Sequence, residues 1–225
     1  MRIERLSRHN VFEEVYHRLF EARGHQCWWP GETPFEVVVG AVLTQNTAWK
    51  NVEKAISNLK KASCLDPQAL FAMPTEELSS LIRPAGYYNI KAKRLKALLG
   101  FLISEAGGDV LNLSRLPVME LRRSLLAIQG IGRETADSII LYAVGKPIFV
   151  VDAYTRRIFS RLGLLDDKMD YDEIRAIFES NLKPDLELFK DYHAQIVVHG
   201  KDQCRKKPRC DGCVLFDMCA IPRGK

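Results

Sequence analysis

The segment LAIQGIGRETA, residues 126–136, constrains the fold of this chain more than any other short stretch. Gly130 and Gly132 flank a single isoleucine, and apolar periodicity predicts helices on both sides, at 118–126 and 134–142. Two glycines allow a tight turn between helices and the close approach of another backbone or of a phosphate. The free N–H groups in the first turn of the second helix then suit an anion. The pattern predicts a helix-hairpin-helix.

The rest of the chain is also patterned as helices. The segment FEVVVGAVL is apolar on almost every side, which suits a buried helix, although periodicity alone would also permit a strand. The segment PIFVV has strand propensity but no partner strand, so it is expected to be an extended connector. We therefore expect an all-α protein with two closely associated lobes. Helices are predicted at 11–23, 35–43, 52–59, 87–105, 118–126, 134–142, 153–162, 172–180 and 186–198.

Composition narrows the class of protein. With 47% hydrophobic and 27% charged residues, the 225-residue chain can bury a core and is not expected to be disordered. No apolar run approaches the roughly 20 residues that cross a bilayer, and the N-terminus lacks a signal-peptide pattern. We expect a cytoplasmic protein without membrane contact. Most of the net charge of +5 lies from Lys201 onward, and a second basic cluster occupies 89–96; both suit phosphates as well as plain solvation.

Four cysteines stand within the final segment CRKKPRCDGCVLFDMC, in a C-x5-C-x2-C-x5-C arrangement. Four thiols so close together in a reducing compartment indicate a metal site rather than disulfides. A zinc site with four thiolate ligands and an iron–sulfur cluster are both consistent with the residues. A single C-x2-C flanked by two longer loops suits the corners of a cubane better. The candidate ligands are Cys204, Cys210, Cys213 and Cys219.

The hairpin, the downstream VVDAY and the cysteine segment, in this order, resemble the endonuclease III superfamily of helix-hairpin-helix DNA glycosylases. The resemblance covers most of the chain and includes GAVLTQNT, GYYNIKAKRL and VHGKDQC. It implies a [4Fe-4S] cluster on the four cysteines, although the family's usual spacing has six residues between the first two, where this chain has five. It also implies two helical lobes, 1–32 with 144–225 and 33–143, the first with the cluster and the second with the hairpin.

The resemblance places the essential catalytic carboxylate at Asp152. Cleavage of an N-glycosidic bond gives the sugar oxocarbenium character, which a buried carboxylate stabilises while it orients a water molecule. An isolated Asp at this place would be interpreted as a plain helix N-cap. Bifunctional relatives carry a lysine at the catalytic position of Glu134, where it attacks the sugar and forms a Schiff base. A glutamate cannot do so, and it also complements the helix dipole. The sequence therefore predicts a monofunctional enzyme.

The segment WWPGETP, together with the other motifs, looks closest to the endonuclease-III-like 3-methyladenine DNA glycosylases. That resemblance implies an aromatic base pocket, and an indole face attracts a cationic alkylated purine by roughly 0.5–2 kcal/mol. The resemblance implies a nucleoid-associated monomer whose substrate is double-stranded DNA containing a damaged base such as 3-methyladenine. The alternatives are a mismatch thymine, uracil or adenine glycosylase of the same fold, and a non-catalytic DNA-binding iron–sulfur protein. The expected pocket residues are Trp28, Trp29, Pro30 and Trp49, and the expected DNA-binding residues are Gln45, Asn46, Tyr87, Lys91, Gly130, Gly132, Arg133 and Thr135.

Overall fold

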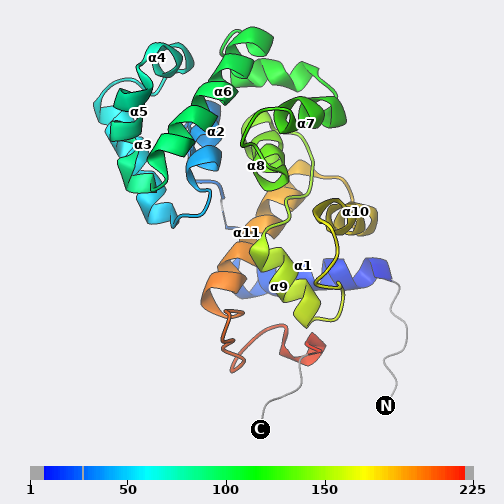
Figure 1. The fold of residues 1–225 in the computed structure, drawn as a ribbon. Coiled ribbons are helices and arrows are strands. Elements are labelled where there is room, and N and C mark those ends of the chain that lie inside the picture. The colour runs from blue at the N-terminus through cyan, green and yellow to red at the C-terminus, as the bar shows by residue number, and fades with distance from the viewer. Residues whose placement is uncertain (1–7, 27, 221–225) are drawn as a thin grey trace. The chain divides into compact units, whose positions relative to one another are not determined.

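The computed structural model describes residues 8–26 and 28–220, and throughout these residues the regular structure is helical, without a strand. The predicted all-α fold class is therefore confirmed. The chain divides into two compact units (Figure 1): unit 1 is Met1–Trp29 with Pro147–Lys225, and unit 2 is Pro30–Lys146. The lobe limits that were expected from the sequence stay a prediction. Within the described segments, no helix is both long and apolar enough to cross a membrane.

Unit 2 is built around a buried helix, α2 (Pro34–Leu43). Thr33 caps its start by accepting a hydrogen bond from the backbone N–H of Glu36, and Pro34 occupies the first turn, where no N–H partner is needed. Residues 35–43 are all buried, so the apolar segment forms a helix and not a strand. Helix α2 packs against its neighbours on several sides (Figure 1). The other elements of unit 2 are α3 (Trp49–Lys61), α4 (Pro67–Ala72), α5 (Thr75–Leu81), η1 (Arg83–Ala85), α6 (Tyr88–Ala106), η2 (Val110–Arg115), α7 (Val118–Leu126), α8 (Arg133–Ser138) and η3 (Ile139–Val144).

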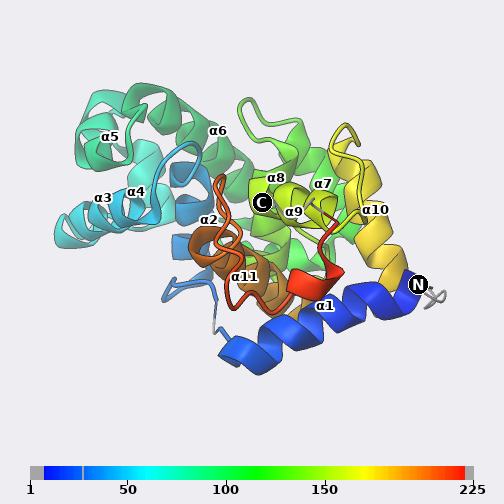
Figure 2. The same cartoon turned by 90° about the horizontal axis from the view of Figure 1, so that it is seen from below.

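Unit 1 brings the two ends of the chain together. Its long helix α11 (Leu186–Asp202) packs against both α1 (Arg8–Arg23) and α9 (Ala153–Arg161), and α1 also contacts α10 (Tyr171–Asn181), as Figure 2 shows. A short 3-10 helix, η4 (Phe216–Met218), follows near the end. An aromatic cluster fills the space between these helices, with Phe149 stacked on Phe178 at 4.0 Å between ring centroids. The cluster comprises Phe12, Phe149, Phe159, Phe178, Phe189 and Tyr192.

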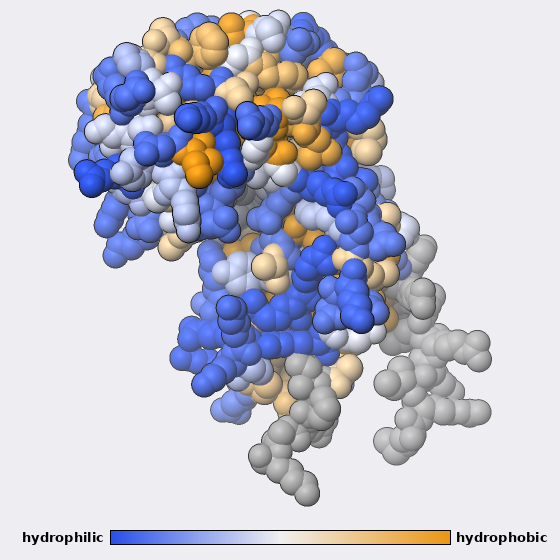
Figure 3. All heavy atoms as spheres, in the orientation of Figure 1, coloured by the Kyte–Doolittle hydropathy of each residue, from blue (hydrophilic) through white to orange (hydrophobic). Residues whose placement is uncertain are grey.

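Several large apolar side chains are exposed on the surface. In the view of Figure 3, the visible face of unit 1 is mostly hydrophilic, and hydrophobic residues form small separate groups on unit 2. Single exposed apolar side chains are ordinary on a globular protein. The exposed large hydrophobic residues are Phe20, Phe71, Tyr87, Ile90, Leu111, Met119 and Phe216.

The structure differs from the sequence-based expectation in several of its short elements. Helices α4 and α5, of six and seven residues, were not predicted, because fewer than two turns carry too little periodicity to detect. Their local signals are Asp66, which caps α4 through the N–H of Ala69, and the prolines Pro67 and Pro74. The helix predicted at 134–142 begins as α8 and continues as the π-helix η3. The segment 147–151, hereafter the connector, has neither helix nor strand, as expected.

A buried ion pair joins the two helices of the hairpin. Arg122 on α7 donates through Nε to Oδ1 of Asp137 at 2.7 Å, and through Nη2 to Oδ2 at 3.2 Å. The two side chains are 6% and 0% exposed. A forked arrangement of this kind pairs the two buried charges, and removal of one partner takes this ion pair from a charge that stays buried.

We predict that Arg122→Met lowers the free energy of unfolding by about 3–5 kcal/mol, because the carboxylate of Asp137 then stays buried without the forked ion pair to Arg122. The measurement is urea denaturation followed by far-ultraviolet circular dichroism. The double variant Arg122→Met/Asp137→Leu is the control, and it should recover most of the loss since no buried charge remains. Equal stability of the single and double variants would contradict this account.

Candidate active site and cysteine loop

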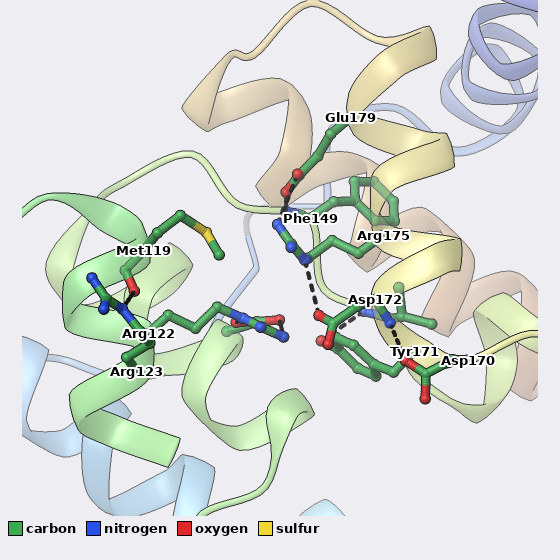
Figure 4. A network of polar contacts seen from close by, with 11 residues as sticks. Met119, Arg122, Arg123, Phe149, Asp170, Tyr171, Asp172, Arg175 and Glu179 are labelled. Atoms are coloured by element: carbon green, nitrogen blue, oxygen red, sulfur yellow. Dashed lines mark hydrogen bonds and ion pairs between the residues drawn. The ribbon is translucent and has the colours of Figure 1, made fainter. Parts of the chain in front are cut away.

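The connector leads into Asp152 at the start of α9. It belongs to no sheet, so its backbone N–H groups have no partner strand. The N–H of Phe149 donates to Oε1 of Glu179 at 3.0 Å, and the N–H of Val151 donates to the hydroxyl oxygen of Tyr171 at 3.2 Å. Both acceptors extend from α10 toward the connector (Figure 4). Side chains thus replace the missing strand partner, because buried backbone N–H groups require an acceptor.

The carboxylate of Asp152 is the N-cap of α9. Its Oδ1 accepts hydrogen bonds from the backbone N–H of Thr155 at 2.7 Å and from the Thr155 hydroxyl at 2.9 Å. The backbone N–H of Asp152 in turn donates to the Thr155 hydroxyl oxygen at 3.3 Å, which completes a reciprocal cap. The second oxygen, Oδ2, lies 3.7 Å from Nε2 of His193 on α11. Asp152 is only 8% exposed, so a charged group is held in a largely dry site.

The pKa of Asp152 lies below its ordinary value. Burial alone would raise it, but the nearby ring of His193 and the two hydrogen bonds from Thr155 together lower it further than burial raises it. The carboxylate is therefore ionised at neutral pH, and its stabilising contacts are lost only when the pH falls through the lowered pKa. His193 was missed in the sequence because it lies within an ordinary helical pattern, and no local motif marks it.

The two glycines of the hairpin play different roles. Gly130 has a φ of +87°, and a Cβ atom there would collide with the side chain of Arg94, so both conformation and space require glycine. Gly132, the N-cap of α8, has a φ of −89°, and a Cβ there would meet nothing within 4 Å. Arg133 and Glu134 follow in the exposed first turn of α8. The space beside Gly132 is therefore open to another molecule.

Gln45 is tied to the hairpin through both ends of its side-chain amide. Its Nε2 donates to the hydroxyl oxygen of Thr135 at 3.0 Å and to the carbonyl oxygen of Gly130 at 3.3 Å. Its Oε1 accepts from Nη1 of Arg94 at 2.5 Å. The loop after α2 is thereby joined to the hairpin. Arg94 belongs to the basic cluster at 89–96, and its role at the turn could not be inferred from charge.

Asn46 and Tyr87 present exposed side chains from an unusual backbone. Their φ angles are +53° and +46°, in the left-handed region that few residues other than glycine adopt. Tyr87 is 69% exposed, and Asn46 is also exposed. Strained backbone with exposed side chains is a feature of binding sites, so both remain candidates for contact with a ligand.

Lys91 does not have the position expected of it. It was predicted to bind DNA, but its side chain is buried, with 1% exposure. Its Nζ donates to the carbonyl oxygens of Leu43 at 2.9 Å and Ala85 at 2.7 Å, which lie at the ends of α2 and η1. Burial lowers the pKa of Lys91 to about 8, and the charge of Arg94 adds to this shift. The predicted phosphate contact is therefore wrong, and Lys91 satisfies carbonyl groups at these helix ends.

The predicted pocket residues fall in both units. Trp28 and Trp29 are half-buried in unit 1, whereas Trp49 is half-buried and Pro30 exposed in unit 2. The ammonium of Lys201 lies over the ring of Trp28, 5.2 Å from its centroid. The indole face of Trp28 is thus able to attract a cation.

Two arginines near the end of α9 hold the segment 204–219, hereafter the cysteine loop. Arg157 donates through Nη2 to the carbonyl of Gly200 at 2.9 Å and through Nε to that of Cys204 at 2.8 Å. Arg161 donates through Nη1 to Sγ of Cys204 at 3.2 Å, and its own carbonyl oxygen accepts from Sγ of Cys219 at 3.4 Å. The helix that begins at Asp152 therefore ends in contact with the cysteine loop.

The thiol of Cys213 lies within electrostatic range of the other three thiols of the cysteine loop. Burial raises the pKa of Cys213, and the charges of Cys204, Cys210 and Cys219 raise it further. As the side chains stand in the described part of the chain, no group of three or more His, Cys, Asp or Glu residues converges to hold a metal ion. Four thiols in one short segment are nevertheless the type of donor set that an iron–sulfur cluster or a zinc ion requires.

Comparison with known proteins gives concordant results. The chain is 51% identical over 214 residues to the "Putative DNA repair glycosylase" of Methanocaldococcus jannaschii, which covers 93% of this chain and 97% of that protein. It resembles the crystal structure of H. pylori 3-methyladenine DNA glycosylase bound to 1,N6-ethenoadenine, with a TM-score of 0.73 and 29% identity over 87% of this chain and 98% of that one.

A structure of a trapped endonuclease III–DNA covalent intermediate is similar as well. Its TM-score is 0.81, with 25% identity over 96% of this chain and 97% of that one. Residues 39–184 also match the family model described as HhH-GPD superfamily base excision DNA repair protein. The chain therefore belongs to the HhH-GPD superfamily, the endonuclease III superfamily of helix-hairpin-helix DNA glycosylases.

Proposed function

We propose that this DNA glycosylase is monofunctional and excises alkylated purines such as 3-methyladenine from double-stranded DNA, with water as the nucleophile. The observation that carries the proposal is the carboxylate of Asp152, which is buried, held by Thr155 and ionised at neutral pH. Membership of a family of base excision repair proteins supplies the reaction class, cleavage of the N-glycosidic bond.

The two carboxylate oxygens of Asp152 have different roles. Oδ1 is engaged by both hydrogen bonds from Thr155, which orient the carboxylate. Oδ2, on the side of His193, is the oxygen that stabilises the positive sugar and orients the attacking water. As the bond breaks, the base leaves with the bonding electrons, and water adds to the sugar carbon and gives up a proton to Oδ2 of Asp152. Asp152 thereby serves as catalytic carboxylate as well as helix cap.

The absence of a lyase step follows from the side chain at position 134. An attacking amine is required to form a Schiff base with the sugar, and Glu134 carries a carboxylate. Glu134 is exposed in the first turn of α8, where its negative charge is favourable at the helix N-terminus. The product is then an intact strand with an abasic site.

Two observations support an alkylated purine as the substrate. The chain is similar to a 3-methyladenine DNA glycosylase over most of its length. In this chain the face of Trp28 already holds a cation, the ammonium of Lys201 at 5.2 Å. Purines alkylated at N3 or N7 also carry positive charge, so stacking on Trp28 and Trp29 favours them over neutral bases.

The hairpin and the cysteine loop are proposed to contact the duplex and to hold the cluster, respectively. The open space beside Gly132 suits a backbone phosphate, and the exposed side chains of Asn46 and Tyr87 suit contacts with the strands near the extruded base. We assign a [4Fe-4S] cluster to the four thiols of the cysteine loop. The cluster's bonds would cross-link the loop, which exposes basic residues for the phosphate backbone. These residues are Arg205, Lys206, Lys207 and Arg209.

We predict that Asp152→Asn reduces base excision by about two to four orders of magnitude, because it removes the negative charge that stabilises the transition state. The variant should still fold, since the amide oxygen can accept the hydrogen bond from the Thr155 N–H. The measurement is release of bases from methylated duplexes, with alkali added to reveal abasic sites.

The unaltered protein is assayed in the same way on duplexes that contain mismatched thymine, uracil or adenine. If it excises a mismatched base faster than 3-methyladenine, that result contradicts the proposed substrate class.

We further predict that borohydride traps no protein–DNA complex on an alkylated duplex, because Glu134 offers no amine to form a Schiff base. The readout is a shifted band on a denaturing gel, with a bifunctional endonuclease III and its own substrate as the positive control. The strand should remain intact until alkali is added. Strong trapping by the unaltered protein would show that another amine reaches the sugar.

The hairpin offers a matched pair of substitutions. Gly132→Val should leave the melting temperature within about 2 °C and weaken binding to damaged and undamaged duplexes alike by about tenfold, because its side chain enters the open space where we place a phosphate. Gly130→Val should instead lower the melting temperature, since Gly130 has a positive φ and lies against Arg94. Fluorescence anisotropy and thermal denaturation measure the two effects. Unchanged affinity of Gly132→Val for DNA would contradict the assignment of a phosphate-binding site to this turn.

A further inference from the structure

A buried chain of polar contacts leads from α1 to the cysteine loop. His199, in the last turn of α11, is only 1% exposed. Its Nδ1 lies 3.1 Å from Nη2 of Arg23, the last residue of α1, and its Nε2 lies 3.8 Å from Sγ of Cys213. The imidazole therefore separates an arginine from a thiol and touches both.

The arginine determines which nitrogen of His199 carries the proton. A guanidinium has only N–H groups to offer and accepts no hydrogen bond. Nδ1 of His199 must therefore be the acceptor, so the ring is neutral and its hydrogen resides on Nε2. That N–H is the group nearest to Cys213, and it can only donate to the sulfur.

We infer that Arg23 and His199 act as a relay that fixes an N–H···S hydrogen bond on Cys213 and thereby stabilises an electron-rich iron–sulfur cluster. The inference rests on the cluster assigned above to the four thiols. A second sulfur has its own donor, because Nη1 of Arg161 lies 3.2 Å from Sγ of Cys204. Arg23 touches no sulfur, so it is a positioning residue that acts through the imidazole.

The inference predicts the direction in which the reduction potential shifts. A hydrogen bond to a ligand sulfur draws electron density from the cluster, which favours the reduced state and makes the reduction potential more positive. Loss of the N–H from His199 therefore shifts the potential in the negative direction. The potential serves here as a measure of the sulfur environment and implies no electron transfer during base excision.

The experiment compares holoproteins prepared anaerobically, by protein-film voltammetry and by iron and sulfide analysis. His199→Leu should shift the potential negatively. Arg23→Met should shift it in the same direction but less, because the freed imidazole still donates in part of the population, and Arg23→Lys should restore it. Gln195→Met is the matched control: Gln195 lies one turn earlier on α11 and donates to the carbonyl of Gly24, but it touches no sulfur. Its potential should not change.

The outcomes distinguish failure of the relay from failure of the cluster assignment and of the proposed function. Iron-loaded protein whose potential is the same in the unaltered form and in His199→Leu would overturn the relay and leave the cluster intact. If His199→Leu retains no iron, Arg23→Met decides, since an unchanged potential in that variant overturns the relay as well. Zinc in place of iron in the unaltered protein would overturn both the cluster and the relay. Base excision, assayed on the same preparations, reports separately on the glycosylase assignment.

Discussion

The cap that Asp152 forms with Thr155 is the interaction on which the arrangement of unit 1 depends. It starts α9, a helix about 13 Å long at 1.5 Å per residue, and the far end of that helix holds the cysteine loop through Arg157 and Arg161. Because a helix is stiff over this length, α9 holds the carboxylate at its first turn and contacts the cysteine loop through side chains farther along.

Polar side chains satisfy buried backbone groups that strand pairing satisfies in other folds. The connector has no neighbouring strand, so Glu179 and Tyr171 on α10 accept its N–H groups. In unit 2, the ammonium of Lys91 satisfies carbonyl groups at the ends of α2 and η1. Each of these groups is buried, where an unmet hydrogen bond would cost about 1–3 kcal/mol. These contacts hold the irregular segments that connect the helices and carry the candidate site.

Much of the fold could be predicted because its signals are local. The helices of more than two turns show a clear apolar period, and the positive φ of Gly130 is a conformation that glycine adopts without strain. Helices α4 and α5 were too short for the same signal. The basic cluster at 89–96 illustrates the limit of charge as evidence. Its charge suited a phosphate-binding surface as well as plain solvation, yet Lys91 is buried and Arg94 lies against the hairpin turn.

The sequence by itself determined the all-helical class, the hairpin, the carboxylate at the start of α9 and the four thiols near the end. Periodicity, capping residues and cysteine spacing all operate over a few residues, so each can be recognised without knowledge of the packing. Only the tertiary structure decided which oxygen of Asp152 faces His193, and that Arg23 meets His199 across 176 positions of the chain. The chemistry of a buried polar group depends on its neighbours, and these are brought together by the packing of helices that are distant in sequence.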